Sequence, residues 1–145
     1  MNSKYYALVG KVATKPLSTI SIELESNVLE QSNEVQISLD SQILQRVIFD
    51  TDLKATVHCT IDDSMASSNS QLKIYLTGGN AVQSVWIRSL TINDIDVTHM
   101  LSHHSVQNDN AVTLLVDKPL WSWMVRQWNQ ILPNSYQLWH QLNKN

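Results

Sequence analysis

Apolar and polar residues alternate in several separate stretches of this chain, and this period of two restricts the possible fold more than any other feature. The clearest stretch places on one face Leu53, Ala55, Val57, Cys59 and Ile61. Because successive side chains of a strand point to opposite faces of a sheet, such alternation is typical of half-buried β-strands. The same pattern recurs at 20–24, 35–39, 72–76 and 112–116. The sequence therefore predicts a mostly-β domain built from many short strands.

Turn signals separate these stretches. Gly78-Gly79-Asn80 supplies residues that tolerate a positive φ. Asn93-Asp94, between two apolar triplets, predicts a two-residue hairpin. The alternation changes parity within 87–90, which indicates a β-bulge near Arg88-Ser89. Many short strands with turns at this spacing favour a β-sandwich or barrel.

Two segments depart from the alternation. Residues 62–70 are polar and rich in serine, so we expect a loop of unusual length there. The apolar residues between Ile43 and Ile48 have helical spacing, with Asp40 or Ser41 as a cap. A short helix is therefore expected over that segment.

After Asp117 the period changes to that of a helix. One helical stripe contains Trp121, Met124, Trp128 and Ile131. Pro119 suits the first turn of such a helix, and Pro133 ends it. We therefore expect a β-sandwich over residues 1–117 and a helical tail over residues 118–145, packed on the same domain or on a partner, in one domain overall.

The composition favours neutral polar partners. Charged residues make up 16% of the chain, against the usual ~25% of soluble domains, and their place is taken by 17 serines, 12 asparagines and 11 glutamines. Such a surface suits carbohydrate or another protein, although the same groups also form an ordinary solvated surface. The net charge is −3 and the basic residues are scattered, so nucleic acid is not expected as a partner.

The single cysteine, Cys59, excludes an intrachain disulfide and a cysteine-based zinc site. The apolar run at residues 5–9 is too short for a signal peptide or for a membrane span. We therefore expect no membrane partner and, by default, a cytoplasmic location. A virion component made inside a cell would have the same features.

The stretch from Val85 to Val116 resembles the second half of galactose-binding-like jelly rolls, the β-sandwich shared by many carbohydrate-binding modules. The matching parts are the hairpin at 90–95, Asp96-Val97-Thr98-His99-Met100-Leu101, Asn110 and the alternating strand at 111–116. The resemblance covers about a fifth of the chain. Asp94 departs from it, because the pattern usually has glycine there, and the helical tail replaces the strand with which the family generally ends.

The resemblance implies a jelly-roll β-sandwich in which Thr98 caps a short turn and Leu101 enters the core. It also implies a module that binds its ligand on a sheet face or at loop tips.

Acidic pairs and histidines are the candidate metal ligands. Asp62 and Asp63 lie beside the expected long loop and could supply carboxylates to calcium, with ordinary turn chemistry as the alternative. Calcium is the one cofactor considered; otherwise none is expected. His99 and His103 have the i, i+4 spacing of a zinc pair, but no further ligand is near, so they are interpreted as exposed loop histidines.

No catalytic residues are expected. The chain contains no GxSxG, P-loop or GxGxxG motif. Glu23 and Glu25 alternate with apolar residues and should point outward on one face, without the context of a known acid/base pair. Cys59 belongs to an apolar face, where a buried thiol is inert. The sequence therefore favours a protein that is not an enzyme.

Tryptophan is the most unusual component. The chain has 5 tryptophans, four of them between Trp121 and Trp139. An indole stacks on the apolar face of a sugar ring or anchors an interface. Trp121 and Trp123 cannot both face the core of one helix, since residues two apart lie some 200° around it. The candidate ligand-binding residues are Trp86, Trp121 and Trp123, and the candidate partner contacts are Trp123, Trp128 and Trp139.

These features support two hypotheses. The first is a non-catalytic binding module whose ligand is a neutral polysaccharide. The second is a structural or assembly protein, for example a virion or baseplate component. Its tryptophan-rich tail would contact another protein or a second copy of the chain in a homo-oligomer.

Overall fold

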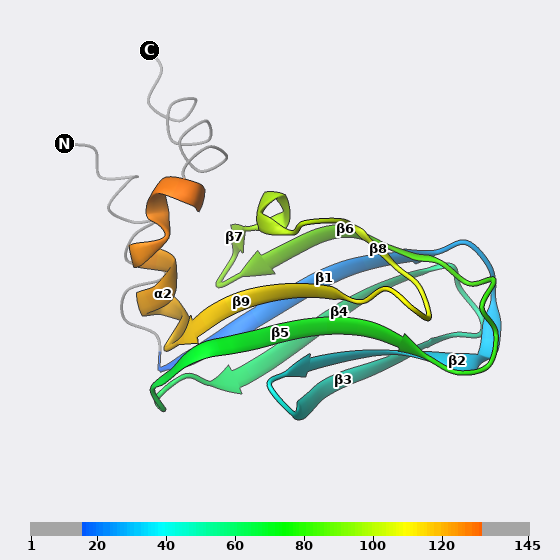
Figure 1. Cartoon of the computed structure of the whole chain (residues 1–145), viewed down its shortest axis with the longest axis horizontal. Coiled ribbons are helices and arrows are strands. Elements are labelled where there is room, and N and C mark those ends of the chain that lie inside the picture. Colours follow the sequence, from blue (N-terminus) through cyan, green and yellow to red (C-terminus); the bar gives the residue numbers. More distant parts are fainter. Residues whose placement is uncertain (1–15, 132–145) are drawn as a thin grey trace, which may run out of the picture.

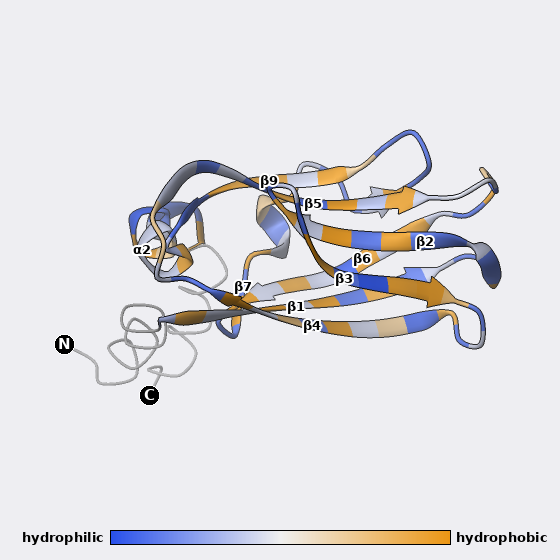
Figure 2. Ribbon diagram, turned by 90° about the horizontal axis from the view of Figure 1, so that it is seen from below, coloured by the Kyte–Doolittle hydropathy of each residue, from blue (hydrophilic) through white to orange (hydrophobic). Residues whose placement is uncertain are grey.

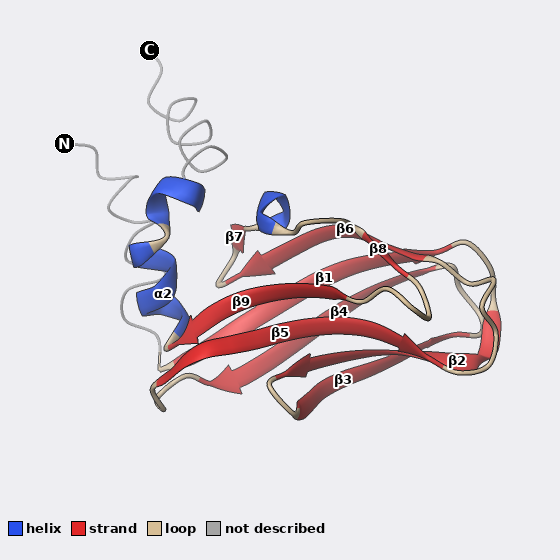
Figure 3. Cartoon of the chain, in the orientation of Figure 1, coloured by secondary structure: helices blue, strands red, loops and turns tan. Residues whose placement is uncertain are grey.

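The computed structural model describes residues 16–131 as two antiparallel sheets that face each other (Figure 1). The strands are β1 (Leu17–Ser26), β2 (Glu30–Leu39), β3 (Gln42–Phe49), β4 (Lys54–Asp62), β5 (Ser67–Thr77), β6 (Val85–Ile92), β7 (Ile95–Asp96), β8 (Ser105–Val106) and β9 (Val112–Lys118). The described part of the chain also contains the 3₁₀ helix η1 (Thr98–Met100) and the α-helix α2 (Leu120–Arg126). Figure 3 shows how strongly strands predominate. None of the helices in this part of the chain is long and apolar enough to cross a membrane.

The strand order is that of a jelly roll. Sheet A has the order β4-β1-β6-β7, with β8 also beside β6, and sheet B has the order β3-β2-β5-β9. The β1–β4 pair in sheet A encloses, in sequence, the β2–β3 hairpin of sheet B. Such nesting of strand pairs across two sheets is the jelly-roll arrangement. The predicted jelly-roll β-sandwich is confirmed.

The core lies between the sheets and is built from the alternating residues. Every apolar position predicted in the stretches at 20–24, 35–39, 72–76 and 112–116 is buried. Figure 2 shows the two layers, with apolar and polar residues alternating along the strands. Leu53 is the exception within its stretch, because it precedes β4 and stays exposed.

Both predicted turns are present. Ile92 pairs with Ile95 across the two-residue hairpin, and Asn93 and Asp94 have φ values of 51° and 67°. Positive φ at both central residues is the signature of a type I′ turn, which matches the twist of antiparallel strands. Gly78 has a φ of 131°, which favours glycine.

The helix expected between Ile43 and Ile48 is wrong: the segment belongs to strand β3. Ile37 pairs with Gln45, and Ser38 pairs with Ile43, so Leu44 is an extra residue in the ladder. A bulge of this kind breaks the alternation and puts apolar residues at a spacing that imitates a helix.

The long loop expected over residues 62–70 is also wrong. Strand β5 begins at Ser67, and only residues 63–66 connect it to β4. The irregular start of β5 contains Asn69 with a φ of 57°, whose N–H donates to the Asp117 carboxylate at 2.8 Å. The first three residues of β5 are exposed polar residues. Because they do not face the core, this part of the strand does not need to alternate with apolar residues.

The tail forms a helix in the expected place but with a different buried face. Pro119 precedes the first turn of α2, and α2 packs on β9 of its own chain at one end of the sandwich (Figure 1). The buried residues of the tail within the described region are Leu120, Trp123, Met124 and Ile131. The predicted stripe had Trp121 and Trp128 in place of Leu120 and Trp123.

Candidate functional site

Trp86 lies on the outer face of sheet A. Its neighbours in β6, Val85 and Ile87, are buried, so the alternation of the strand turns the indole outward, and its side chain is 45% exposed. The strand register places beside it a row of outward residues from the neighbouring strands: Lys54, Glu25 and Ser105. Directly opposite residues in antiparallel strands lie close enough for their side chains to interact. The start of β6, which carries this row, lies at the end of the sandwich remote from α2 (Figure 1).

The β-bulge in β6 brings Arg88 to the same face. Glu23 pairs with Ser89 and Leu24 with Ile87, so Arg88 is the extra residue and the bulge predicted near Arg88-Ser89 is confirmed. Bulges often redirect a side chain in this way.

Arg88 contacts both Trp86 and Glu25. Its Nε donates to Glu25 Oε1 at 3.0 Å, and its guanidinium carbon lies 5.7 Å from the centroid of the Trp86 ring. An exposed ion pair of this kind contributes little to stability. It places the carboxylate, the guanidinium and the indole next to one another on the outer face of sheet A.

A hollow of about 190 Å³ adjoins Glu25, Lys54 and Arg88, and Trp86 is not among the residues that line it. It is lined by Glu23, Leu24, Glu25, Lys54, Ala55, Thr56 and Arg88. This volume is below the ~300–1,000 Å³ of sites for drug-sized ligands, so it suits a group the size of one ring. We call Trp86, the row beside it and this hollow the Trp86 face.

The Trp86 face combines an apolar platform with both kinds of hydrogen-bonding group. The indole offers a flat apolar surface. Glu23 and Glu25 accept hydrogen bonds, Lys54 and Arg88 donate them, and the Thr56 hydroxyl does both. The arrangement suits a ligand with one apolar face and several hydroxyl groups at its edge.

The other candidate tryptophans lie differently from the prediction. Trp123 is only 4% exposed, packed in the core of its own domain, so the expectation that it is an outward ligand or partner contact is wrong. Trp121 and Trp128 are half-buried against the core. Trp139 lies outside the described residues. Within 16–131, Trp86 is therefore the tryptophan with the greatest exposure.

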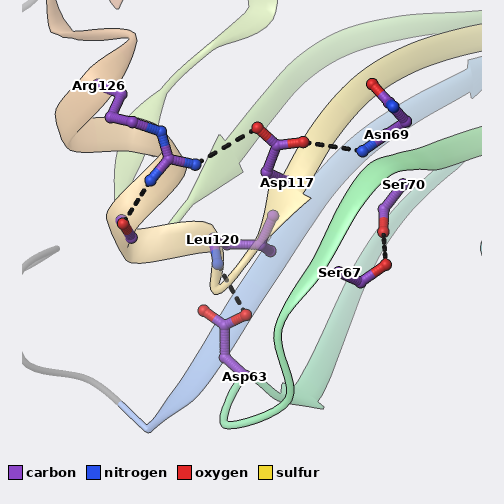
Figure 4. A network of polar contacts seen from close by, with 8 residues as sticks. Asp63, Ser67, Asn69, Ser70, Asp117, Leu120 and Arg126 are labelled. Atoms are coloured by element: carbon purple, nitrogen blue, oxygen red, sulfur yellow. Dashed lines mark hydrogen bonds and ion pairs between the residues drawn. The ribbon is translucent and has the colours of Figure 1, made fainter.

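Asp62 and Asp63, the candidate calcium ligands, make separate contacts within the chain. Asp63 is buried, and its carboxylate accepts hydrogen bonds from the Ser18 hydroxyl at 2.6 Å, from Leu120 N–H at 2.7 Å and from Trp121 N–H at 3.3 Å. Figure 4 shows Asp63 directed at the first residue of α2. The exposed Asp62 instead accepts from Ser64. Both carboxylate oxygens of Asp63 accept hydrogen bonds from the chain, so Asp63 is a helix cap.

His99 and His103, the candidate zinc pair, each contact another residue of the chain. His99 Nε2 donates to the Gln130 carbonyl at 2.7 Å, and His103 Nδ1 lies 3.1 Å from the Ser102 hydroxyl. Residues 16–131 contain no group of three or more His, Cys, Asp or Glu side chains that could hold a metal ion.

The parts of the chain that resemble galactose-binding-like jelly rolls act as scaffold. Asp96 accepts the Thr98 N–H at 2.8 Å and so caps η1, while the Thr98 hydroxyl accepts the Leu90 N–H at 2.8 Å and ties the turn to β6. Leu101 is buried, as expected. The cap of this turn is therefore Asp96 instead of the predicted Thr98. Thr98 stabilises the turn by its hydrogen bond to β6.

The sequence predicts Trp86 as a ligand-binding residue, and the structure places it on the surface, but the sequence does not indicate the residues around it. Glu25 was expected to point outward without a function, and Lys54 and Arg88 were not singled out. The parity change at 87–90 was the one available signal for Arg88, since a bulge in a strand next to an exposed tryptophan marks a redirected side chain.

Comparison with known proteins gives two matches, both to solved structures. No protein-family model matches the chain, and no curated protein sequence matches it significantly. The selenomethionine form of vCBM60, described as a calcium-dependent carbohydrate binding module, aligns over 66% of this chain and 88% of its own, with 9% identity and a TM-score of 0.47. The complex of vCBM60 with galactobiose aligns over 67% of this chain and 95% of its own, with 10% identity and a TM-score of 0.44. The calcium dependence and the binding of galactobiose are described for vCBM60.

Proposed function

We propose that this protein is a non-catalytic carbohydrate-binding module that holds a sugar ring of a neutral polysaccharide against Trp86. The observation that carries the proposal is the exposed indole of Trp86, which contacts Arg88 and lies opposite Glu25, two residues that also line the neighbouring hollow.

The chemistry of a neutral sugar matches that of the Trp86 face. The apolar face of the ring covers the indole, and the hydroxyls at its edge meet Glu25, Lys54 and Thr56. Covering the exposed part of the indole contributes on the order of 1–2 kcal/mol. Since 1.4 kcal/mol corresponds to a factor of ten in affinity, loss of the indole should weaken binding by about tenfold or more.

Calcium is not part of this proposal, because the Asp63 carboxylate caps α2. An assembly role is not proposed either. That hypothesis is based on the tail tryptophans, of which Trp123 is buried in its own domain, Trp128 is half-buried and Trp139 lies outside the described residues.

The test is affinity electrophoresis in native gels that contain soluble neutral polysaccharides, with galactan, xylan and β-glucan as probes. The intact chain should be retarded by at least one of them. Trp86→Ala should lose most of the retardation, and Trp86→Phe, which keeps an aromatic face, should retain part of it. Ile48→Ala is the matched control, because it also removes an exposed apolar side chain, but from sheet B. Equal retardation of Trp86→Ala and the intact chain would contradict the proposal.

A further inference from the structure

A second and larger hollow lies in another part of the molecule, among η1, β9 and α2. Its volume is about 460 Å³. It is lined by Met100, Ser102, Thr113, Leu114, Leu115, Trp123, Gln127 and Gln130. It shares no residue with the Trp86 face, and its volume is within the ~300–1,000 Å³ range of ligand sites. We call it the tail hollow.

Fixed contacts hold the walls of the tail hollow in place. The His99 side chain donates to the Gln130 carbonyl at 2.7 Å and so joins the η1 turn to the chain beyond α2. Trp123 and Leu120 anchor α2 in the core, and Asp63 caps its first turn. The hollow is therefore formed by β9, which is a strand of the sandwich, and by η1 and α2, which these contacts hold in place.

The polar groups of the tail hollow are uncharged, and several have no partner. Its lining contains no Asp, Glu, Lys, Arg or His. Within residues 16–131, no hydrogen bond is made by the side-chain amides of Gln127 and Gln130 or by the Thr113 hydroxyl. Amides and hydroxyls both donate and accept, so they suit the hydroxyl groups of a neutral ligand.

The floor of the hollow supplies an apolar surface. Leu115 is 63% exposed on β9, an edge strand of sheet B, and the half-buried Met100 also lines the hollow. A purely apolar ligand would leave the surrounding amides and hydroxyls without partners, which costs free energy. A charged ligand would find no opposite charge.

We infer that the tail hollow is a second saccharide site, which takes an uncharged sugar with its apolar face on Leu115 and its hydroxyls on Gln127, Gln130 and Thr113. The choice of a saccharide rests on the proposed function, whereas the uncharged and amphipathic character of the ligand follows from the lining. A polysaccharide that reached both sites would bind more tightly than either site alone allows, because the second contact becomes intramolecular.

The test uses ¹H–¹⁵N NMR of the full chain titrated with galactose, xylose and N-acetylglucosamine. We expect saturable shifts of the amides of Thr113, Leu115 and Gln127 with at least one sugar. These shifts should persist in Trp86→Ala, which removes the platform of the other site. They should be lost in Leu115→Lys and kept in Ile48→Lys, which places the same charge on the other edge strand of sheet B. The dispersion of each spectrum shows whether the variant is folded.

The outcomes separate the two sites. Shifts around Trp86 without shifts in the tail hollow would overturn the second site and leave the proposed function standing. Shifts in the hollow without shifts around Trp86 would support the second site and contradict the proposed one. Saturation of the hollow by decanol but not by any sugar would also overturn the inference, since it would show an apolar pocket.

Discussion

At the scale of the residue, one buried carboxylate joins the tail to the sandwich. Asp63, 1% exposed, connects Ser18 of β1 to the first two N–H groups of α2. The buried Asn93 extends this network, since its side-chain amide donates to the Ser18 hydroxyl at 3.2 Å. The N-terminal N–H groups of a helix need such acceptors because they have none within the helix.

Asp63→Ala should therefore lower the free energy of unfolding by about 1–3 kcal/mol, because it leaves buried donors without an acceptor. Urea denaturation followed by circular dichroism measures the change. Asp62→Ala is the matched control, since Asp62 is exposed, and should change stability by no more than about 0.5 kcal/mol. Equal effects of the two substitutions would show that Asp63 is not a structural cap.

Cys59 should react slowly with thiol reagents. It is buried between β-strand neighbours, and burial raises the pKa of its thiol. A raised pKa leaves less of the reactive thiolate at a given pH. Labelling by iodoacetamide at pH 8 should be many times slower in the native protein than in urea. Comparable rates in the two states would contradict the burial of this side chain.

These two residues differ in how far the sequence predicts them. The burial of Cys59 follows from alternation within one strand and was predicted. The role of Asp63 depends on partners 45 and 57 positions away in the chain, which no local pattern contains. For that reason, a turn aspartate and a possible calcium ligand could not be told apart from this helix cap.

At the scale of the element, most strands and the bulge in β6 follow from the alternation, whereas strand β3 and the start of β5 do not. Strand β3 carries a bulge at Leu44, which gives its apolar residues a helical spacing. The start of β5 contains Asn69 in the left-handed region, and its serines resemble a loop. In both cases the ladder to a neighbouring strand, rather than local periodicity, determines the structure.

The buried face of α2 was mispredicted for a related reason. The helix has only 7 residues, so its own pattern specifies its rotation weakly. The Asp63 cap and the contact with β9 determine which side faces the core, and they select Leu120 and Trp123.

The turn between β5 and β6 offers a sharp test at this scale. A Cβ at Gly78 would lie 2.1 Å from Asn33 Oδ1 and 2.5 Å from the Ser32 carbonyl, whereas a Cβ at Gly79 would have no neighbour within 4 Å. Gly78 also has a φ of 131°, where side chains are strained.

Gly78→Ala should thus destabilise the fold by at least about 1–3 kcal/mol. Gly79→Ala should change stability by no more than about 1 kcal/mol in either direction. Thermal melting of the two variants beside the intact chain measures the difference. Similar melting temperatures for both variants would show that the close approach of Gly78 to Asn33 is incorrect.

At the scale of the whole molecule, the outer faces of the two sheets differ in how their side chains interact. On sheet B, the Tyr75 hydroxyl donates to Gln36, Gln36 donates to Glu34, and Glu34 pairs with Arg46. On sheet A, the indole of Trp86 stays 45% exposed beside a hollow. The sequence predicts the sandwich but does not predict this difference between its faces. The difference arises because the register of the strands places side chains from separate strands next to one another.

The central claim is that Trp86 is covered by a bound saccharide, and the indole N–H signals of the protein test it most directly. The chain has 5 tryptophans and so gives five such signals in a ¹H–¹⁵N spectrum, of which Trp86→Phe identifies the one from Trp86. The titration uses short oligosaccharides of the polysaccharide that retards the protein in native gels. The Trp86 signal should shift and saturate at the concentration where binding saturates. Saturable binding that leaves the Trp86 signal in place, or an absence of binding by every oligosaccharide, would contradict the claim.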